Sequence, residues 1–519
     1  MMFEPRSIPE AFAAAVERYG AAPLVVEGDR ALSFVDIDRQ SDGVAAALIA
    51  AGIRHGDRVA LYCPNGAAFV SAYLGIVKAG AVVVPVNLLI QAAEAAYVLR
   101  DAGVSGVIYH AALAEKLAGF RTSLGEQRCW IRIGARGEQP GELSFDEACR
   151  CTRPAVLPEI QPLRDLAAIL YTSGTTGRPK GAMLTHHNLV SNTESVREAL
   201  AFEAGRDRLL VVLPMFHSFA ATVGMLTPAL HGLSLVPVAG FDPVAVSDAI
   251  VANTCSVFLG VPSMYNVIQR IDDTHAAKWR SITLGVAGGA AMPVDLLQRF
   301  EARFGFPVLE GDGPTECSPV TCVNPRDGAR KPASVGVAVP GVAIGIFDEQ
   351  GHALAKGEIG EICVRGPNVM KGYWGLPDAT AEVFFGEWLR TGDLGYVDTD
   401  GYVFMVDRKK DMVIVNGMNV YPRMIEEVLY QHPAVLEAAV VGEPNARHGE
   451  IVVAYLVAND GAAVADADMR DFCRRLLGPH QVPRRFEWRD NLPKNATGKI
   501  LKRELRRAGE IERGVDLSR

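Results

Sequence analysis

Short apolar runs separated by helix-like spacers dominate the first part of the chain. Between Asp57 and Val86, RVALYCPNG and AGAVVVPVN flank the spacer AAFVSAYLGIVKAG. Similar runs recur as GVSGVIYH, LAAILYTSG, DRLLVVLPM, LSLVPVAGF and CSVFLGVPS, and spacers such as DPVAVSDAIVAN separate the later ones. Strands that are buried on both faces of a parallel sheet are continuously apolar. The pattern therefore predicts a layered α/β fold with parallel sheets.

The pattern changes after about residue 330, where SVGVAVPGVAIGIFD, GEIGEICVRG and GYVFMVDRK alternate and are bounded by glycine turns. Such segments favour antiparallel strands, which we expect to form a β-barrel-like part. The last part of the chain contains VYPRMIEEVLYQHPAV, EIVVAYLVAND and DADMRDFCRRLLG, an α+β pattern that is large enough for its own core. We predict a large multi-layer N-terminal domain at residues 1–407 and a small mobile α+β domain at residues 408–519.

Two charged segments are expected to face solvent, because that is the usual place of charge runs. One is the stretch from Asp407 to Asp411 at the predicted boundary. The other is the basic tail LKRELRRAGEIER, which we expect to form a solvated helix.

Composition supports a globular protein and narrows its class. A length of 519 residues exceeds what one core usually organises, and 49% hydrophobic with 22% charged residues suits a soluble enzyme. The net charge of -8 gives no general attraction to nucleic acid. The start has no signal-like pattern, and the apolar run at residues 79–90 is too short and too interrupted by proline to span a bilayer. We therefore expect a cytoplasmic protein without a transmembrane segment.

Cysteine usage favours reduced thiols. The chain has nine cysteines, an odd number, without a CxxC pair. Cys149 and Cys151 lack the second half of a zinc site. Cys317 lies beside a motif described below, but a free cysteine commonly behaves as a small buried hydrophobe, so no catalytic role is expected for it.

The strongest local signal is the segment YTSGTTGRPKG at residues 171–181, directly after the apolar run LAAIL. Glycines allow close backbone approach, hydroxyls donate hydrogen bonds and a lysine adds positive charge, so this loop suits phosphate groups. It is neither a Walker A loop nor a GxGxxG fingerprint. The candidate phosphate-binding residues are Thr172, Ser173, Gly174, Thr175, Thr176, Gly177 and Lys180.

This segment resembles the signature loop of the adenylate-forming superfamily, which includes acyl-CoA synthetases, luciferases and peptide-synthetase adenylation domains. Further motifs similar to those of the family follow in order: LPMFHSF at 213–219, GDGPTE at 311–316, TGDLGYVDTDGYV at 391–403, DRKKDMVIVNGMNVYP at 407–422 and LPKNATGK at 492–499. The resemblance covers essentially the whole chain and is closest to the fatty-acid:CoA ligase branch. It implies ATP, Mg²⁺ and coenzyme A as the small molecules that the protein uses.

The resemblance assigns roles around the nucleotide. Glu316, with Thr175, would hold magnesium, and Thr315 would donate to the α-phosphate. Asp393 would accept the ribose hydroxyls, and Arg408 would contact the same sugar. Lys499 would be the catalytic lysine that stabilises charge on the phosphate oxygens during attack by the acid.

It also assigns the acid and thiol sites. His217 resembles the gate beside the acid carboxylate, although a lone histidine among apolar residues is more often part of a core. Lys410 matches the hinge of a domain swing before thioester formation, and Gly417 the glycine that then lines the pantetheine tunnel. The segment that flanks adenine and the acid corresponds to Gly288, Gly289 and Ala290, and the walls of the acid pocket to Phe219, Val261 and Met264.

Two positions depart from the family pattern. Asp312, before Gly313, stands where most relatives carry an aromatic ring that stacks on adenine. A carboxylate cannot stack, but it can accept a hydrogen bond from the adenine amino group. Met424 stands where many relatives have an acid, and nothing in the sequence explains that change.

The resulting hypothesis is an ATP-dependent acid–thiol ligase that makes an acyl-adenylate and then an acyl-CoA. A medium- to long-chain fatty acid is the first expectation because the pocket segments are apolar, and an aryl or cycloalkyl carboxylate is the alternative. Two further alternatives stay open: an enzyme that loads a carrier protein, and a non-catalytic nucleotide-binding relative. A homodimer is possible.

Overall fold

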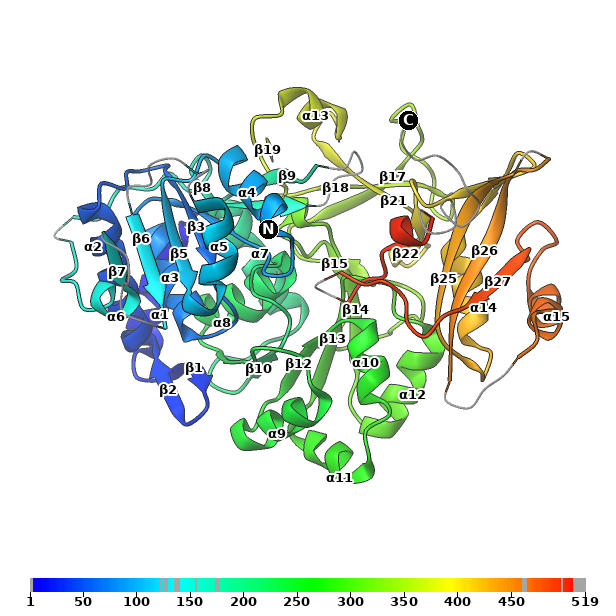
Figure 1. The fold of residues 1–519 in the computed structure, drawn as a ribbon, viewed down its shortest axis with the longest axis horizontal. Coiled ribbons are helices and arrows are strands. Elements are labelled where there is room, and N and C mark those ends of the chain that lie inside the picture. The colour runs from blue at the N-terminus through cyan, green and yellow to red at the C-terminus, as the bar shows by residue number, and fades with distance from the viewer. Residues whose placement is uncertain are drawn as a thin grey trace.

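Two large sheets carry the first part of the chain (Figure 1). In this computed structural model the described residues are 3–121, 124, 129–134, 141–154, 156–172, 178–445, 447–459, 464–495 and 498–506. The nine-stranded sheet has the order β16 (Val337–Ala338), β15 (Cys322–Val323), β14 (Val308–Asp312), β13 (Leu284–Ala287), β12 (Val257–Gly260), β10 (Arg208–Val211), β11 (Ser234–Pro237), β1 (Pro23–Glu27) and β2 (Arg30–Ser33). Strands β14, β13, β12, β10, β11 and β1 are parallel, as predicted.

The eight-stranded sheet has the order β19 (Gly372–Tyr373), β9 (Lys180–Thr185), β8 (Leu166–Thr172), β4 (Val82–Pro85), β3 (Arg58–Tyr62), β5 (Gly106–His110), β6 (Cys129–Ile133) and β7 (Glu142–Ser144). Its central strands are parallel, whereas β8 and β9 are antiparallel with Thr172 opposite Lys180. The phosphate-loop motif therefore connects two adjacent antiparallel strands, because so short a connection cannot join parallel neighbours.

Helices pack between and around these sheets. Their bounds are α1 (Ile8–Tyr19), α2 (Phe34–Ala50), α3 (Ala67–Lys78), α4 (Ala92–Asp101), α5 (Ala114–Arg121), α6 (Phe145–Ala148), α7 (His186–Ala199), α8 (Thr227–His231), α9 (Pro243–Asn253), α10 (Pro262–Ile268), α11 (Asp273–Ala276), α12 (Val294–Phe304) and α13 (Pro377–Glu382). Short 3₁₀ turns cover Ala111–Leu113, Ala277–Ser281 and Thr315–Cys317, and Ala220–Leu226 is a π-helix. The largest core cluster combines buried residues of both sheets with α1, α2, α3 and α7.

The start of α7 is encoded locally. The Thr185 hydroxyl accepts from the Asn188 N–H at 3.1 Å, and the Asn188 side chain accepts from the Thr185 N–H at 2.8 Å. This reciprocal capping satisfies two helix-end donors directly after β9. It fixes the path of the chain from the phosphate-loop motif into the core.

The antiparallel region predicted after residue 330 is confirmed as a five-stranded sheet. Its strands are β17 (Ala343–Phe347), β18 (Gly360–Arg365), β20 (Phe384–Phe385), β21 (Trp388–Val397) and β22 (Val403–Arg408). Register places Asp393 opposite Arg408.

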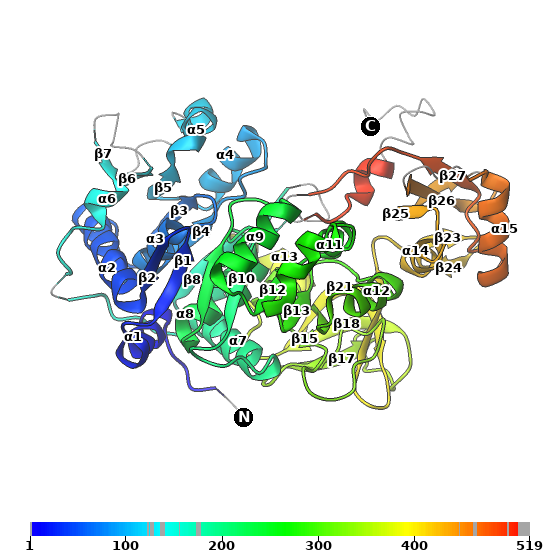
Figure 2. The ribbon, with the colours of Figure 1, turned by 90° about the horizontal axis from the view of Figure 1, so that it is seen from below.

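The C-terminal α+β domain is confirmed and lies on one side of the larger part (Figures 1 and 2). It contains β23 (Val413–Val415), β24 (Met418–Val420), α14 (Pro422–Tyr430), β25 (Val435–Asn445), β26 (Gly449–Ala458), α15 (Asp466–Leu476) and β27 (Arg485–Trp488). Two apolar clusters of its own stabilise it. At the junction, the Asn266 amide donates to the Leu436 carbonyl at 3.2 Å, and Arg270 donates to Asn459 at 2.7 Å.

The basic tail is only partly solvated where the structure describes it. Residues 502–506 are helical with Arg503 and Glu504 exposed, as predicted, but the opposite face of this helix is docked. The Lys502 ammonium lies 2.8 Å from a Glu426 carboxylate oxygen, and Leu505 is 4% exposed in a cluster with Val441 and Tyr455. The charge of the tail suggested exposure to solvent, but a local sequence pattern cannot reveal a distant partner such as Glu426 on α14. The charge run at Asp407–Asp411 forms the expected turn at residues 409–411, where Lys410 is exposed, but Asp407 at its start is buried. None of the helices in the described part of the chain has the length and apolar composition that a bilayer crossing requires.

Candidate active site

A cleft of about 2250 Å³ lies where the large sheets, the antiparallel sheet and the C-terminal segment meet. Gly288 follows β13 and Asp312 ends β14, so both stand at the carboxyl edge of parallel strands. Ligands of open α/β sheets bind at this edge. The C-terminal segment contributes Lys499 from the opposite side.

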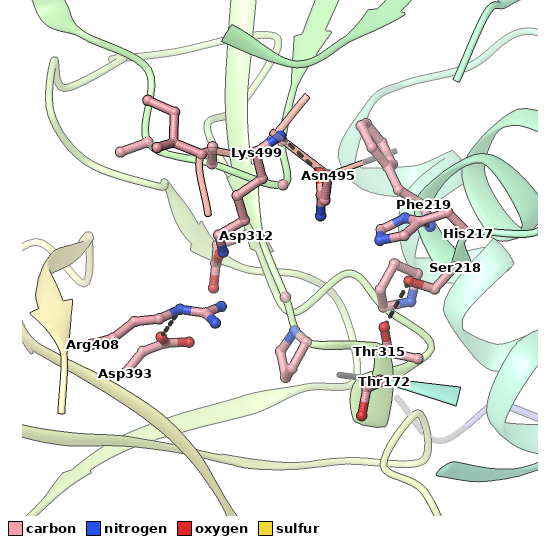
Figure 3. A pocket seen from close by; sticks show the side chains of 18 of the residues that line it. Thr172, His217, Ser218, Phe219, Asp312, Thr315, Asp393, Arg408, Asn495 and Lys499 are labelled. Carbon is pink, nitrogen blue, oxygen red and sulfur yellow. Dashed lines mark hydrogen bonds and ion pairs between the residues drawn. The ribbon is translucent and has the colours of Figure 1, made fainter. Parts of the chain in front are cut away.

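On the N-terminal side of the cleft, Glu316 is held by two hydroxyl groups. Its Oε1 accepts from Tyr373 Oη at 2.8 Å and from Thr172 Oγ1 at 3.4 Å. Thr315, the preceding residue, shares a hydrogen bond of 3.1 Å with Ser218 Oγ (Figure 3). The Lys180 ammonium lies 5.2 Å from the centre of the Tyr373 ring, so the cation and the carboxylate are placed by the same tyrosine.

This donor set fits a magnesium ion that is shared with phosphates. In the described residues, no three His, Cys, Asp or Glu side chains gather into a metal cluster. Mg²⁺ needs no such cage, because it usually binds through one or two carboxylates together with water and phosphate oxygens. Glu316 supplies a carboxylate at the cleft, and its Oε1 already collects two hydroxyl donors.

Asp393 and Arg408 form an ion pair across β21 and β22, with Nε 3.1 Å from Oδ1 (Figure 3). Asp393 is 4% exposed, and its charge raises the pKa of Arg408 above the usual value. The chain around Asp393 is fixed by Glu361, whose carboxylate accepts from the Gly392 N–H at 3.2 Å. The pair is therefore preorganised at the cleft wall.

Lys499 reaches the cleft from a segment outside regular secondary structure. Its N–H donates to Asn495 Oδ1 at 2.9 Å, and its carbonyl accepts from the Asn495 N–H at 2.9 Å. Burial, followed by the charge of Arg408, lowers the pKa of Lys499 to about 8. Figure 3 shows Asp312 in the space between Lys499 and Arg408. Burial raises the pKa of Asp312 to about 6, although both cations oppose this shift.

His217 lies in the inner part of the cleft beside Phe219 (Figure 3). Burial, and then the charge of Lys499, lowers the pKa of His217 to about 4, so the ring is neutral near pH 7. Its Nδ1 accepts from the Phe219 N–H at 3.4 Å, which leaves the proton on Nε2. A neutral imidazole of this tautomer can donate one hydrogen bond into the cleft.

The comparisons with known proteins agree with this geometry. The sequence profile of the AMP-binding enzyme matches residues 12–374, and that of the AMP-binding enzyme C-terminal domain matches residues 424–499. The chain belongs to the AMP-binding enzyme family.

Two curated relatives and one solved structure illustrate the similarity. A long-chain-fatty-acid–CoA ligase from Bacillus subtilis (strain 168) is 36% identical, covering 91% of this chain and 89% of the relative. A feruloyl-CoA synthase from Amycolatopsis sp is 38% identical, covering 94% and 96%. The crystal structure of ATP-bound MatB from Rhodopseudomonas palustris has a TM-score of 0.89 at 32% identity, and the match covers 99% of this chain and 100% of that one.

In this AMP-binding enzyme the structure brings together most residues that the sequence singled out. Those that line the cleft are Thr172, Lys180, His217, Phe219, Gly288, Gly289, Ala290, Asp312, Gly313, Thr315, Glu316, Asp393, Arg408, Lys410 and Lys499. Gly289 has φ +79°, and a Cβ at Gly313 would lie 1.6 Å from the Pro319 carbonyl oxygen. Both positions therefore require glycine.

Other predicted residues lie elsewhere. Val261 and Met264 are buried in the main core rather than at the cleft surface, although a Cβ at Gly289 would lie 3.6 Å from Val261. Gly417 lies exposed in the turn between β23 and β24, away from the residues that line the cleft. The residues Ser173, Gly174, Thr175, Thr176 and Gly177 lie outside the described part of the chain.

The sequence reasoning missed Tyr373 and Ser218, which this enzyme uses to place Glu316 and Thr315. Ser218 lies inside the LPMFHSF motif, so the motif could have drawn attention to it. Tyr373 lies in KGYWG and pairs with β9 in the sheet, a long-range contact that no local pattern signals.

Proposed function

We propose that this ATP-dependent acid–CoA ligase acts on a medium- to long-chain fatty acid. The observation that carries the proposal is the apolar inner lining of the cleft. It includes Val196, Leu200, Val223, Val320, Val323 and Val335, which come from α7, the π-helix and the segments around β15. A straight acyl chain gains about 0.8 kcal/mol for each methylene that it buries.

Neutral His217, Phe219 and the ammonium of Lys499 line the same cleft as these apolar residues. We propose that the acid carboxylate lies between His217 and Lys499 with its tail inward. The imidazole can donate a hydrogen bond to one carboxylate oxygen, while the other oxygen faces the nucleotide. Phe219 lies close to the loop, because a Cβ at Gly288 would lie 3.3 Å from its ring.

In the first half-reaction, a carboxylate oxygen attacks the α-phosphorus of ATP, and the bond to the bridging oxygen of pyrophosphate breaks. Negative charge grows on the phosphate oxygens during this step. A largely desolvated ammonium stabilises that charge more strongly than one in water, which supports the role of Lys499. Asp393 and Arg408 would position the ribose, and Thr315, Lys180 and the loop at 172–177 would hold the phosphates. Glu316 and Thr175 would hold Mg²⁺, which would supply neutralisation of the triphosphate charge.

In the second half-reaction, the sulfur of coenzyme A attacks the acyl carbon and AMP leaves. We propose a domain boundary at residues 407 and 408, with Lys410 as the hinge and Gly417 beside the pantetheine arm after a domain rotation. The exposed place of Gly417 supports this division of roles, because it leaves the turn accessible to the larger domain. All nine cysteines are free, which supports a reducing cytoplasmic location.

An aromatic acid is the second candidate, and the feruloyl-CoA synthase at 38% identity favours it. An aromatic acid would bury its ring beside Phe219, whereas the chain of a long fatty acid would also fill the region of Leu200 and Val335. The dependence of kcat/KM on the chain length of the acid therefore separates the two candidates.

The test is acid-dependent pyrophosphate release with MgATP, measured for straight-chain acids from hexanoate to palmitate and for benzoate and ferulate. We expect kcat/KM to rise with chain length and thioester to form only when CoA is added. Lys499→Ala is the control for release that does not come from this site. A preference for ferulate would support the aromatic alternative. Acyl transfer to a holo-carrier protein but not to CoA would support the carrier-loading alternative, and ATP binding without any release would support the non-catalytic one.

A further inference from the structure

The loop between β13 and α12 is held by two carboxylates from different domains, of which Glu310 is buried and Glu427 partly buried. This loop carries Gly288, Gly289 and Ala290, which line the cleft. Farther along it, the Met292 N–H donates to Glu310 Oε1 at 2.9 Å. The Val294 N–H, at the start of α12, donates to Glu427 Oε2 at 3.5 Å. Glu310 lies on β14, whereas Glu427 lies on α14 of the C-terminal domain.

Arg423, also on α14, lies beside Glu310 and carries a positive charge near both carboxylates. Its Nη2 lies 3.8 Å from Glu310 Oε1, and the side chains of Arg423 and Glu310 are 11% and 2% exposed. Burial raises the pKa values of Glu310 and Glu427, and the charge of Arg423 lowers both. Burial is the larger influence, and the pKa of Glu310 is about 7, so the charge of Arg423 offsets part of the cost of burying these carboxylates. A carboxylate that is ionised accepts a stronger hydrogen bond.

The position of Arg423 depends on the predicted boundary between the domains. Its N–H donates to Asp407 Oδ2 at 2.9 Å, directly before Arg408. Within the described residues its Nη1 is buried without a hydrogen-bond partner, and Glu310 is the carboxylate of the larger domain with which its Nη2 forms an ion pair. A buried guanidinium with its carboxylate removed is costly. The arginine thus favours the domain orientation in which it meets Glu310.

We propose that Arg423, Glu310 and Glu427 form an interdomain clamp that positions the loop at 288–293 for adenylation. The inference rests on the proposed function for its kinetic consequence. The orientation that closes the clamp also places Lys499 in the cleft, so the loop is ordered when the catalytic cation is present. Thioester formation after a domain rotation would not use the clamp. Arg423 is accordingly a positioning residue.

The kinetic test compares the two half-reactions in Arg423→Met. We expect kcat/KM for acid-dependent ATP–pyrophosphate exchange to fall about tenfold or more, because small misplacements of a binding loop are costly. Thioester formation from a preformed acyl-adenylate and CoA should change less than about twofold. Arg423→Lys, which keeps the charge but loses the planar fork, should recover part of the exchange rate. Equal losses in both half-reactions would overturn the proposal.

Arg270→Met is the matched control. It also removes an interdomain hydrogen bond, that from Arg270 to Asn459, but an exposed one that does not involve the N–H groups of the loop. We expect less than about twofold change in either half-reaction, because the contact is exposed. A loss like that of Arg423→Met would show that any weakened interface has the same effect.

Glu310→Gln, alone and combined with Arg423→Met, tests whether Glu310 and Arg423 act as a unit. If they do, the double variant should be within about twofold of the worse single variant. A loss of exchange rate in the double variant equal to the product of the two single losses would contradict the clamp.

Hydrogen exchange separates the clamp from the proposed function, because it needs no substrate. In Arg423→Met, the amides of Met292 and Val294 should exchange faster than in the wild type, while Arg270→Met leaves them unchanged. Unchanged exchange in Arg423→Met would overturn the clamp whichever acid the enzyme uses. A wild type that fails to exchange pyrophosphate with any acid, but shows this faster amide exchange in the variant, would overturn the proposed function and support the clamp. The thermal midpoint of each variant checks that it is folded.

Discussion

The two sides of the cleft are built differently. On the N-terminal side, Glu316 is fixed by Tyr373 and Thr172, and Asp393 by the strand pairing of β21 and β22. On the C-terminal side, Lys499 lies on a segment outside regular secondary structure, and its backbone bonds reach no farther than Asn495. Within the described residues, its ammonium makes no hydrogen bond. The cations and carboxylates of the proposed nucleotide site are preformed, whereas the proposed catalytic cation is placed by the docking of a domain.

This difference has a chemical purpose in a two-step ligase. A group that is needed in one half-reaction and obstructive in the other is best carried by an element that can leave. Groups that hold the nucleotide through both steps are best fixed in sheets. The predictions below test this division from its strongest consequence to its weakest.

The largest effect is expected for Lys499→Ala. Loss of a preorganised charge at a developing anion costs about 10²- to 10³-fold in rate, so ATP–pyrophosphate exchange should fall by that amount. Thioester formation from a preformed acyl-adenylate should be nearly unchanged, because Lys499 would then be away from the site. An equal loss of rate in both half-reactions would contradict the division, because Lys499 would then act in both steps as the fixed groups do.

The next effect concerns the stability of the mobile side. Lys502→Met leaves Glu426 buried without its cation, and we expect a loss of about 2 kcal/mol in the free energy of unfolding of the C-terminal domain, because breaking one partner of a largely buried pair is costly. Denaturant unfolding measures it. Arg474→Met, which removes an exposed pair with Asp471, is the control and should change stability by less than about 0.5 kcal/mol. Equal effects would show that the tail segment is not docked in solution.

The Lys502 result also marks where sequence reasoning stopped. The strands and the phosphate-loop motif were predictable because apolar runs and glycine-rich loops are local in sequence. The cleft residues Glu316, Asp393 and Lys499 followed from the resemblance to a family with the same motifs in the same order. The docking of Lys502 and Leu505 was not, since it depends on α14 and on β25 and β26. Tyr373 was missed for the same reason. Val261 and Met264 show the converse, because an apolar wall segment and a core segment have the same sequence pattern.

A smaller effect should appear in the pH dependence of adenylation. Burial lowers the pKa of Lys499 to about 8 in the free enzyme, so the ammonium is charged below pH 8 and neutral above it. The value of kcat/KM for ATP should therefore fall above pH 8, by up to about tenfold for each pH unit. Lys499→Arg keeps its charge and should lose this descending limb at a lower overall rate. His217, with a pKa of about 4, should add no limb between pH 6 and 8. A limb that persists in Lys499→Arg would have to come from another group.

The smallest effect is expected on the fixed side, from Tyr373→Phe. The phenol donates to Glu316 at 2.8 Å, and its ring lies 5.2 Å from the Lys180 ammonium. Phenylalanine keeps the ring beside Lys180 but loses the hydroxyl, and a hydrogen bond to a charged group is worth about 1.5 kcal/mol when water does not replace it. Tyr373 and Glu316 are only partly buried, so water can replace part of this bond and we expect only about a three- to fivefold rise in KM for MgATP. Tyr373→Ala removes the ring as well and should raise KM further. If the nucleotide site is fixed, both substitutions should slow both half-reactions. An effect of Tyr373→Phe that is confined to adenylation would show that Glu316 also moves between the two steps.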